Sequence, residues 1–243
     1  MGRLYQLMMT KCNESQVAIL SRFFKTGKGQ YGEGDKFLGI KVPVTRSVVK
    51  QYVKGEVLVD DIEECITSEY HEMRMAGLQV LVWIYRKIKK NEERQKWCVD
   101  YYLSHLEWIN NWDLVDLSCY DILGNWLLTR DRNLLYDLAR NGKTIWEQRI
   151  GIVSTMAFAR AGQTDDIYRI AEIFLSKDDK LHDLLQKAVG WLLREAGKRN
   201  EQQLKAWLLP RCSTMPRTML RYAIEKFKEE ERKRFLVPST SSG

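Results

Sequence analysis

Proline is scarce in this sequence, and long apolar runs are missing. Only four prolines occur among 243 residues, and none lies between Pro43 and Pro210. Proline breaks helices because it lacks a backbone N–H, so this interval can hold long uninterrupted helices. No apolar run approaches the roughly 18 residues of a membrane span, and the N-terminal segment lacks the apolar core of a secretory signal. We therefore expect a soluble protein with no membrane partner.

Cysteine and histidine usage argues against disulfides and metal sites. The five cysteines are scattered and form no CxxC pair. The three histidines, His71, His105 and His182, are far apart and show no metal-ligand spacing such as HExxH. An odd number of dispersed cysteines fits reduced thiols in a cytoplasm. The sequence therefore predicts a cytoplasmic protein with no metal and no cofactor.

Positive charge and tryptophan are abundant. The formal net charge is +7, and there are eight tryptophans. A basic balance favours a polyanionic partner, although many basic proteins bind no nucleic acid. Buried tryptophans explain most such excesses, whereas exposed ones on a basic face suit stacking on bases or sugars. Composition alone leaves both explanations open.

Amphipathic periodicity runs through most of the chain and predicts an all-α fold. Met73, Ala76, Val80 and Ile84 recur at intervals of three and four, and basic residues close their segment. No run alternates as a half-buried strand does. Helices are predicted at residues 15–26, 44–54, 59–67, 70–90, 93–106, 112–128, 131–141, 144–160, 165–175, 180–198, 200–208 and 215–235. Short polar joints between them indicate antiparallel helix hairpins.

A weak internal repeat indicates that these hairpins stack. Val115, Ile152 and Val189 occupy matching places at intervals of 37 residues. This period lies near those of helical-repeat proteins, although it is shorter than the HEAT range. Stacked two-helix repeats form a curved superhelix with a concave face. We therefore predict an α-α superhelix, or solenoid, forming one domain over residues 1–236, with a disordered tail at residues 237–243.

A glycine-rich segment at residues 25–43 interrupts the helical pattern. Its five glycines predict a loop before a helix that starts near Val44. The segment is no phosphate loop, because its GxGxxG pattern follows no strand. Lys41 lies at the end of this loop and Arg46 just beyond it, and both are candidate contacts to a polyanion.

Trp112 and Asp116 lie at i and i+4, on one face of a predicted helix. Asn110 or Asn111 could cap this helix, and Asp113 suits the positive end of its dipole. Capping and packing explain these residues without any catalysis. An aromatic plate and a carboxylate aimed at one substrate are the alternative, but the pattern alone favours capping and packing.

Arg149 falls in the middle of an otherwise apolar predicted helix. One interpretation is a solvated arginine whose stem passes the edge of the core. The other is a phosphate clamp, since a guanidinium holds phosphate oxygens through two parallel hydrogen bonds. The pattern alone favours the solvated arginine.

A stripe of three cations surrounds a tryptophan on the helix predicted at residues 180–198. Lys187, Trp191, Arg194 and Lys198 follow one another at spacings of four, three and four. Such a stripe suits contact with a phosphate backbone, with the aromatic ring on a sugar or base. An ordinary basic face, with Trp191 covering the edge of the core, has the same pattern.

Four stretches together resemble the AlkD-like family of bacterial DNA alkylation-repair glycosylases. They are "FLGIKVPVTR", "INNWDLVD", "IWEQRIGIVST" and "LLQKAVGWLLREAGKRN", and they extend from about residue 37 to about residue 200. The combination of "KAVGWLLRE" with the upstream "WDxVD" is the most specific part. The resemblance implies HEAT-like two-helix repeats that form a concave, basic groove for duplex DNA. It also implies a monomer.

The resemblance implies a reaction and roles for individual residues. Members of the family excise cationic alkylated purines, notably 3-methyladenine and 7-methylguanine, and are known for not needing to flip the base. By resemblance, Trp112 and Trp191 are the active-site tryptophans, Asp116 is the catalytic carboxylate and Arg149 contacts DNA beside them. A cationic purine leaves readily, so one carboxylate that stabilises the oxocarbenium-like deoxyribose suffices.

Two other functions compete with this expectation. The first is a DNA-binding relative that has no excision activity. The second is a helical-repeat scaffold that binds protein in its concave face. DNA binding that weakens steeply with salt would distinguish the first from the second.

Overall fold

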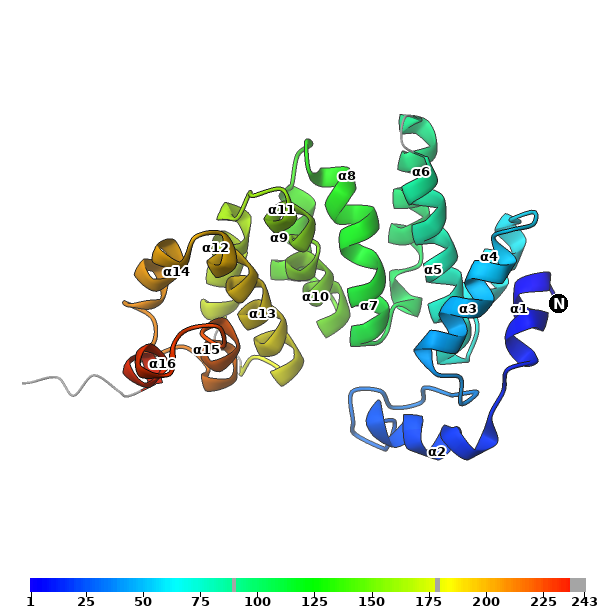
Figure 1. The fold of residues 1–243 in the computed structure, drawn as a ribbon, viewed down its shortest axis with the longest axis horizontal. Helices are drawn as coiled ribbons and strands as arrows, with labels where there is room; N and C mark the ends of the chain where they lie inside the picture. The colour runs from blue at the N-terminus through cyan, green and yellow to red at the C-terminus, as the bar shows by residue number, and fades with distance from the viewer. Residues whose placement is uncertain (89–90, 178–179, 237–243) are drawn as a thin grey trace, which may run out of the picture. The chain divides into compact units, whose positions relative to one another are not determined.

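The computed structural model describes residues 1–88, 91–177 and 180–236 of the chain (Figure 1). Within those residues the protein is helical, with no β-strand, and one isolated parallel bridge pairs Lys36 with Tyr70. The predicted all-α class is therefore confirmed. The predicted disordered tail, residues 237–243, lies outside the described residues. The helices form two compact units, Met1–Ile122 and Leu123–Gly243.

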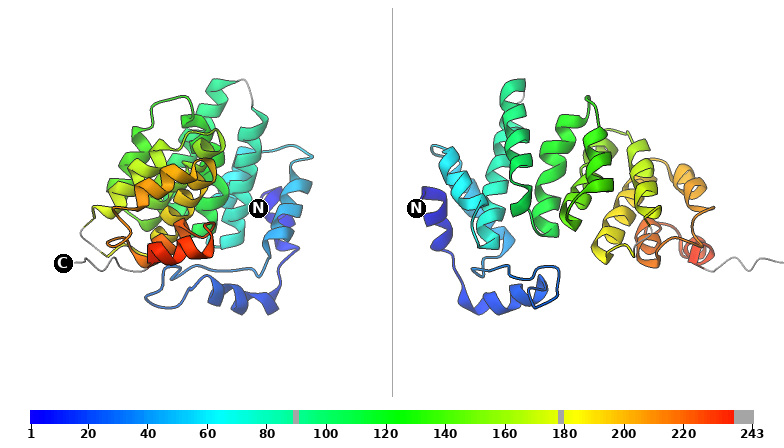
Figure 2. Two further views of the ribbon diagram at one scale, coloured as in Figure 1. Left: turned by 60° about the vertical axis from the view of Figure 1, so that its left-hand side comes forward. Right: turned by 180° about the vertical axis from the view of Figure 1, so that it is seen from behind.

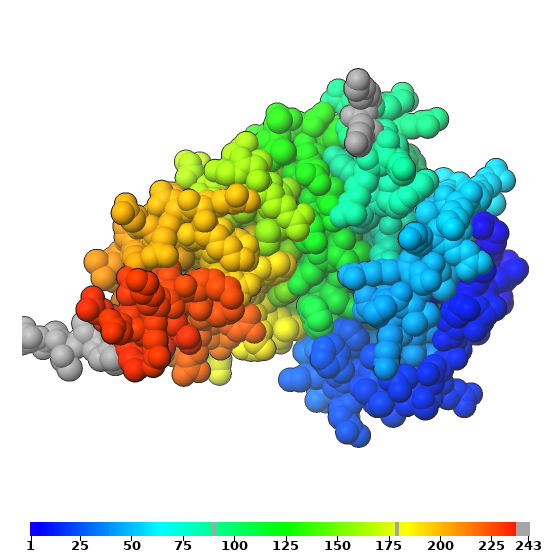
Figure 3. All heavy atoms as spheres, viewed as in Figure 1, coloured from blue at the N-terminus to red at the C-terminus, as the bar shows by residue number. Residues whose placement is uncertain are grey.

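The first unit is built around α5, which is buried on nearly all sides. Helices α3, α4, α6 and α7 pack against α5, and α1 packs against α3 and α4. Figures 1 and 2 show α2 crossing below α3, and Figure 3 shows its atoms and those of the following segment (blue) at that end of the unit. The elements are α1 (Arg3–Met9), α2 (Glu14–Phe23), α3 (Val42–Tyr52), α4 (Val59–Ile66), α5 (His71–Lys87), α6 (Glu92–Ser104), the 3₁₀ turn η1 (Leu106–Trp108) and α7 (Trp112–Cys119).

The second unit is built around α13, which contacts α10, α11, α12, α14 and α15. Gly190 allows α15 to approach α13 closely, because a Cβ there would lie 2.4 Å from the carbonyl oxygen of Met219 on α15. A π-helical turn, η2 (Tyr120–Gly124), precedes this unit's first helix. The helices are α8 (Asn125–Leu127), α9 (Asn133–Asn141), α10 (Ile145–Val153), α11 (Met156–Arg160), α12 (Asp165–Leu175), α13 (Asp183–Arg199), α14 (Glu201–Leu208), α15 (Arg217–Ala223) and α16 (Glu229–Leu236).

Most predicted helices are present, but three expectations need correction. Helix α1 was not predicted, because seven residues carry too little periodicity; Leu4 and Met8 form its buried side. The predicted helix at 144–160 breaks after Val153, and there the hydroxyl of Thr155 donates to the carbonyl of Ile152 at 2.6 Å. The predicted helix at 215–235 divides into α15 and α16, because Phe227 turns inward between them.

The glycine-rich segment is hydrogen-bonded to the first turn of α5. The buried carboxylate of Glu72 accepts hydrogen bonds from the backbone N–H groups of Leu38 and Ile40, both at 3.0 Å. Gly39 lies between them with φ of +78°, and a Cβ at this position would lie 1.9 Å from the carbonyl oxygen of Asn13. The "FLGI" stretch therefore needs its glycine both for backbone conformation and for space.

The cysteines are free thiols, as predicted. Cys65, Cys98 and Cys119 are buried, whereas Cys12 is exposed. Among the described residues, no helix combines the length and apolar character required to cross a membrane. The described residues also contain no group of three or more His, Cys, Asp and Glu side chains placed to hold a metal ion.

Candidate functional site

The first turn of α7 is set by two side chains that flank Trp112. Asn111 is the N-cap, and its Oδ1 accepts from the backbone N–H of Trp112 at 2.9 Å. Oδ1 of Asp113 accepts from the N–H of Leu114 at 2.9 Å. Of the two capping candidates, Asn111 therefore acts, and Asp113 adds negative charge at the positive end of the helix.

Trp112 stands on an aromatic cluster formed by the end of α2. Its ring stacks on that of Phe24, with centroids 5.7 Å apart, and meets the edge of Phe23 at 6.2 Å. Phe24 is buried, whereas Phe23 is 60% exposed and Trp112 is half-buried. The indole is thus supported from within the unit and still reaches its surface.

Asp116 follows Trp112 by one helical turn and is also half-buried. It lies close enough to Tyr102 for its charge to act there: burial chiefly raises the pKa of Tyr102, and the negative charge of Asp116 adds to the increase. The structure therefore brings Trp112 and Asp116 together on one face of α7, as their spacing predicted.

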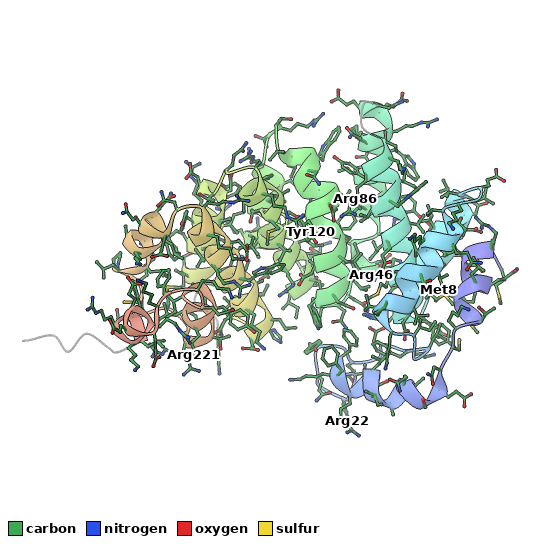
Figure 4. The ribbon with its side chains drawn as sticks, in the orientation of Figure 1. Met8, Arg22, Arg46, Arg86, Tyr120 and Arg221 are labelled. Atoms are coloured by element: carbon green, nitrogen blue, oxygen red, sulfur yellow. The ribbon has the colours of Figure 1, made fainter. Side chains whose placement is uncertain are left out.

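A basic cavity of about 410 Å³ opens between α3, α5 and the end of α7. Its cations are Arg46 and Lys50 from α3 and Arg86 from α5, and its aromatic walls are Trp83 and Tyr120. Figure 4 shows Arg46, Arg86 and Tyr120 gathered on one face of the first unit. We call this cavity, with its lining residues, the α3–α5 cavity.

The three cations of the α3–α5 cavity differ in their partners. Arg86 donates to the carboxylate of Asp121 through Nε at 3.2 Å and through a terminal nitrogen at 2.7 Å. Arg46 and Lys50 are exposed, and the described residues provide no carboxylate within ion-pair distance of either. Two uncompensated positive charges beside aromatic walls suit a phosphate-bearing ligand.

The sequence pointed to only part of this cavity. Arg46 was a candidate, but Lys50 and Arg86 were not. Lys50 follows Arg46 by one turn, a spacing that could have identified it. Arg86 is among the basic residues that close the helix predicted at 70–90, where a cation also complements the C-terminal dipole. Lys41, the other candidate near the glycine-rich segment, is exposed at the N-cap of α3 and does not line the cavity.

Arg149 is buried rather than solvated. It lies on α10 with 5% of its surface exposed, and a terminal nitrogen donates to the carbonyl oxygen of Leu184 at 2.5 Å. The interpretation of an arginine that reaches past the core into solvent is therefore wrong. Leu184 belongs to the first turn of α13, so Arg149 ties α10 to the helix that carries Trp191.

The cations of the α13 stripe all have acidic partners. Lys187 pairs with Asp183 at 2.6 Å, and Lys198 pairs with Glu195 at 2.7 Å. Arg194 pairs with Glu225. Trp191 is half-buried among them. This arrangement supports the interpretation of an ordinary basic face, and phosphate contact by these residues stays a prediction.

One comparison with known proteins identifies a family for this chain. The family model described as DNA alkylation repair enzyme matches residues 6–227. A search of curated proteins finds no match. Among solved structures, the chain is similar to "Predicted DNA alkylation repair enzyme from Enterococcus faecalis", with a TM-score of 0.69 and 18% identity over 90% of this chain and 98% of that one. At this identity the likeness concerns the fold. The family match spans nearly the whole sequence, and the chain therefore belongs to the AlkD-like family of DNA alkylation repair enzymes.

Proposed function

We propose that this protein is a monofunctional DNA N-glycosylase that excises cationic N3- and N7-alkylated purines, such as 3-methyladenine and 7-methylguanine, from duplex DNA. The observation that supports this proposal most directly is the pairing of Trp112 and Asp116 on one partly exposed face of α7, in a chain of this family. Trp191 is the proposed second aromatic group, and Arg149 the proposed arginine beside the reacting nucleotide.

The chemistry needs only one carboxylate. An alkylated purine already carries positive charge, so it departs as a neutral base when the N-glycosidic bond breaks and its electron pair passes to the purine. Positive charge then builds on the deoxyribose, and Asp116 stabilises it. Water adds to C1′, and its proton passes to Asp116 or to solvent. No Schiff base forms, so no strand cleavage by a lyase step is expected.

The tryptophans supply selectivity for the lesion. A cation over an indole face gains roughly 0.5–2 kcal/mol, whereas a neutral base lacks this attraction. The support of Trp112 by Phe24 holds its ring in place before the substrate arrives. Contact at the sugar and the lesion, without flipping of the base, would leave room for adducts of different size.

The proposed DNA interface combines residues of both units, which act on one duplex as a single domain over residues 1–236. We propose HEAT-like repeats in an α-α superhelix, acting as a monomer, with a concave basic groove for DNA. Arg46 and Lys50 of the α3–α5 cavity are the best-supported phosphate contacts, whereas Arg86 beside them is engaged by Asp121. Lys41, Arg149, Lys187, Arg194 and Lys198 are weaker proposed contacts, because the three cations on α13 already pair with carboxylates.

The test is release of free base from N-methylated duplex DNA by the wild-type protein and Asp116→Asn. The variant should release base at least about 100-fold more slowly, because a group that stabilises developing charge is lost. Its affinity for the duplex should stay within about twofold of wild type. Asp100→Asn, an exposed carboxylate paired with Lys96 on α6, is the matched control.

The remaining outcomes distinguish the competing functions. Wild-type excision that survives in Asp116→Asn would remove Asp116 from the mechanism. Duplex binding without base release from any variant would indicate a DNA-binding relative that lacks catalysis. No binding to DNA at low salt would favour the protein-binding scaffold.

A further inference from the structure

A buried histidine joins three segments of the first unit next to the first turn of α7. His71 begins α5, and its side chain is 1% exposed. Its Nδ1 lies 2.9 Å from a carboxylate oxygen of Asp35, in the glycine-rich segment, and its Nε2 lies 2.9 Å from a carboxylate oxygen of Asp113, on α7. Ionised carboxylates only accept hydrogen bonds, so both ring nitrogens donate when both acids are charged.

The same histidine also contacts the aromatic support of Trp112. Its ring lies 4.7 Å from the ring of Phe24 and 4.8 Å from that of Phe37, and Phe24 in turn stacks on Trp112. His71 therefore contacts two neighbours of Trp112. One is Asp113, which follows Trp112 in the chain, and the other is Phe24, whose ring stacks on the indole.

The charges around His71 balance. Asp35 is also bonded by Arg74, which donates its other terminal nitrogen to the carbonyl oxygen of Ser68 at 2.7 Å. The charged groups that face the imidazole are thus Asp113 from α7, Asp35 from the glycine-rich segment and, through Asp35, Arg74 from α5. Burial lowers the pKa of His71, but Asp113 and then Asp35 outweigh burial and raise it to about 9.

We propose that His71, as a double hydrogen-bond donor to Asp35 and Asp113, is a positioning residue for excision. By holding Asp113 and Phe24 it fixes the first turn of α7, and with it the presentation of Trp112 and Asp116. The inference rests on the proposed function, because the roles of those two residues come from it. A misplacement of about 1 Å in a catalytic group can cost about 100-fold in rate.

The first experiment compares His71→Gln with His105→Gln in single-turnover release of base from N-methylated duplex DNA. His105 is the matched control, because it pairs with Glu63 at 3.0 Å in the same unit and contacts neither Trp112 nor Asp113. His71→Gln should lose at least about tenfold in rate while its duplex Kd stays within about twofold. A folded His71→Gln protein that excises at the wild-type rate would overturn the proposal.

The second experiment does not depend on removing the histidine. Asp113→Asn keeps an acceptor for Nε2 but removes the charge that favours the imidazolium. The wild-type rate should fall as pH rises through about 9, and in Asp113→Asn this alkaline limb should move to lower pH by about one unit or more. If the alkaline limb of the pH–rate profile lies at the same pH in Asp113→Asn and wild type, the proposed role of His71 is wrong.

A third measurement separates this inference from the proposed function. If the wild-type protein releases no base, the proposed function fails, and ring-nitrogen NMR of wild-type protein still tests His71. Both ring nitrogens should be protonated at pH 7, and loss of the proton should shift the indole resonance of Trp112, assigned with Trp112→Phe. A neutral ring at pH 7, or an indole signal that ignores the titration, would overturn the proposal.

Discussion

Helices α7 and α13 each carry a half-buried tryptophan among charged residues at helical spacing, yet their charges are arranged in opposite ways. On α7, Asp113 joins the buried His71, which also bonds Asp35. On α13, the cations pair with carboxylates at or near the protein surface. A charged residue beside the tryptophan therefore joins a buried network in the first unit, whereas the charged residues beside Trp191 form ion pairs nearer the surface in the second.

This difference changes which cations are the better candidates for binding DNA. A cation that already holds a carboxylate must exchange that partner for a phosphate, so little is gained. Arg46 and Lys50 need no such exchange. The α3–α5 cavity is thus a stronger candidate than the α13 stripe, although the stripe was the clearer pattern in the sequence.

The largest expected effect comes from removing one partner of a buried charge pair in the first unit, compared with a surface pair in the second. Arg74→Ala leaves the buried Asp35 short of a cation and should lower the free energy of unfolding by about 3–5 kcal/mol. Lys187→Ala removes a surface pair and should cost less than about 0.5 kcal/mol. Urea denaturation measures both. Similar losses in the two variants would abolish the distinction between the units.

The second test uses pH. Because the folded pKa of His71 is raised to about 9, its contribution to stability is complete below the unfolded value of 6.5 and is lost as pH rises through about 9. Burial raises the pKa of Asp35, but His71 and Arg74 outweigh burial and lower this pKa. Asp35 therefore stabilises the folded state above its unfolded pKa of 3.8, and this contribution is lost as the pH falls below that value. Thermal unfolding from pH 4 to 10 should show the alkaline decline in wild type and His105→Gln but not in a folded His71→Phe variant.

The third test concerns how α13 is held, which is by close backbone packing rather than by buried charge. Gly190→Ala would push a Cβ against the backbone of Met219 and should cost about 1–3 kcal/mol. In Gly197→Ala the Cβ meets only the flexible end of Leu204, and the loss should be smaller. Equal stability of the two variants would show that this contact is not tight.

The smallest expected effect separates the two candidate DNA surfaces. Lys50→Ala should reduce the slope of log affinity against log salt concentration by about 0.9, the value for one lost phosphate contact. Lys198→Ala, whose lysine is engaged by Glu195, should leave the slope nearly unchanged. Fluorescence anisotropy with an undamaged duplex at several salt concentrations measures both slopes. The reverse result would restore the α13 stripe as the DNA contact.

The sequence predicts what depends on local periodicity. It identified most helices, the start of α7 and the shared face of Trp112 and Asp116, because i and i+4 neighbours meet in any helix. It could not predict contacts between distant segments, such as His71 with Asp35 and Asp113. Nor could it show that Arg149 is buried and donates to the carbonyl oxygen of Leu184, since an arginine in the middle of a helix has the same sequence pattern whether it is buried or exposed.

The π-helical turn after Cys119 changes the register of the helix that carries the proposed carboxylate. It spans Tyr120–Gly124, so the 3.6-residue periodicity before the turn does not continue in register after it. One residue more or less in such a turn would change the helical register of α8 by about 100° and leave the register of Trp112 and Asp116 unchanged. Alignments of relatives across this turn should therefore be anchored separately on each side, because a single-residue gap there would leave the face of Trp112 and Asp116 unchanged and reassign the face of Asn125 and Leu127.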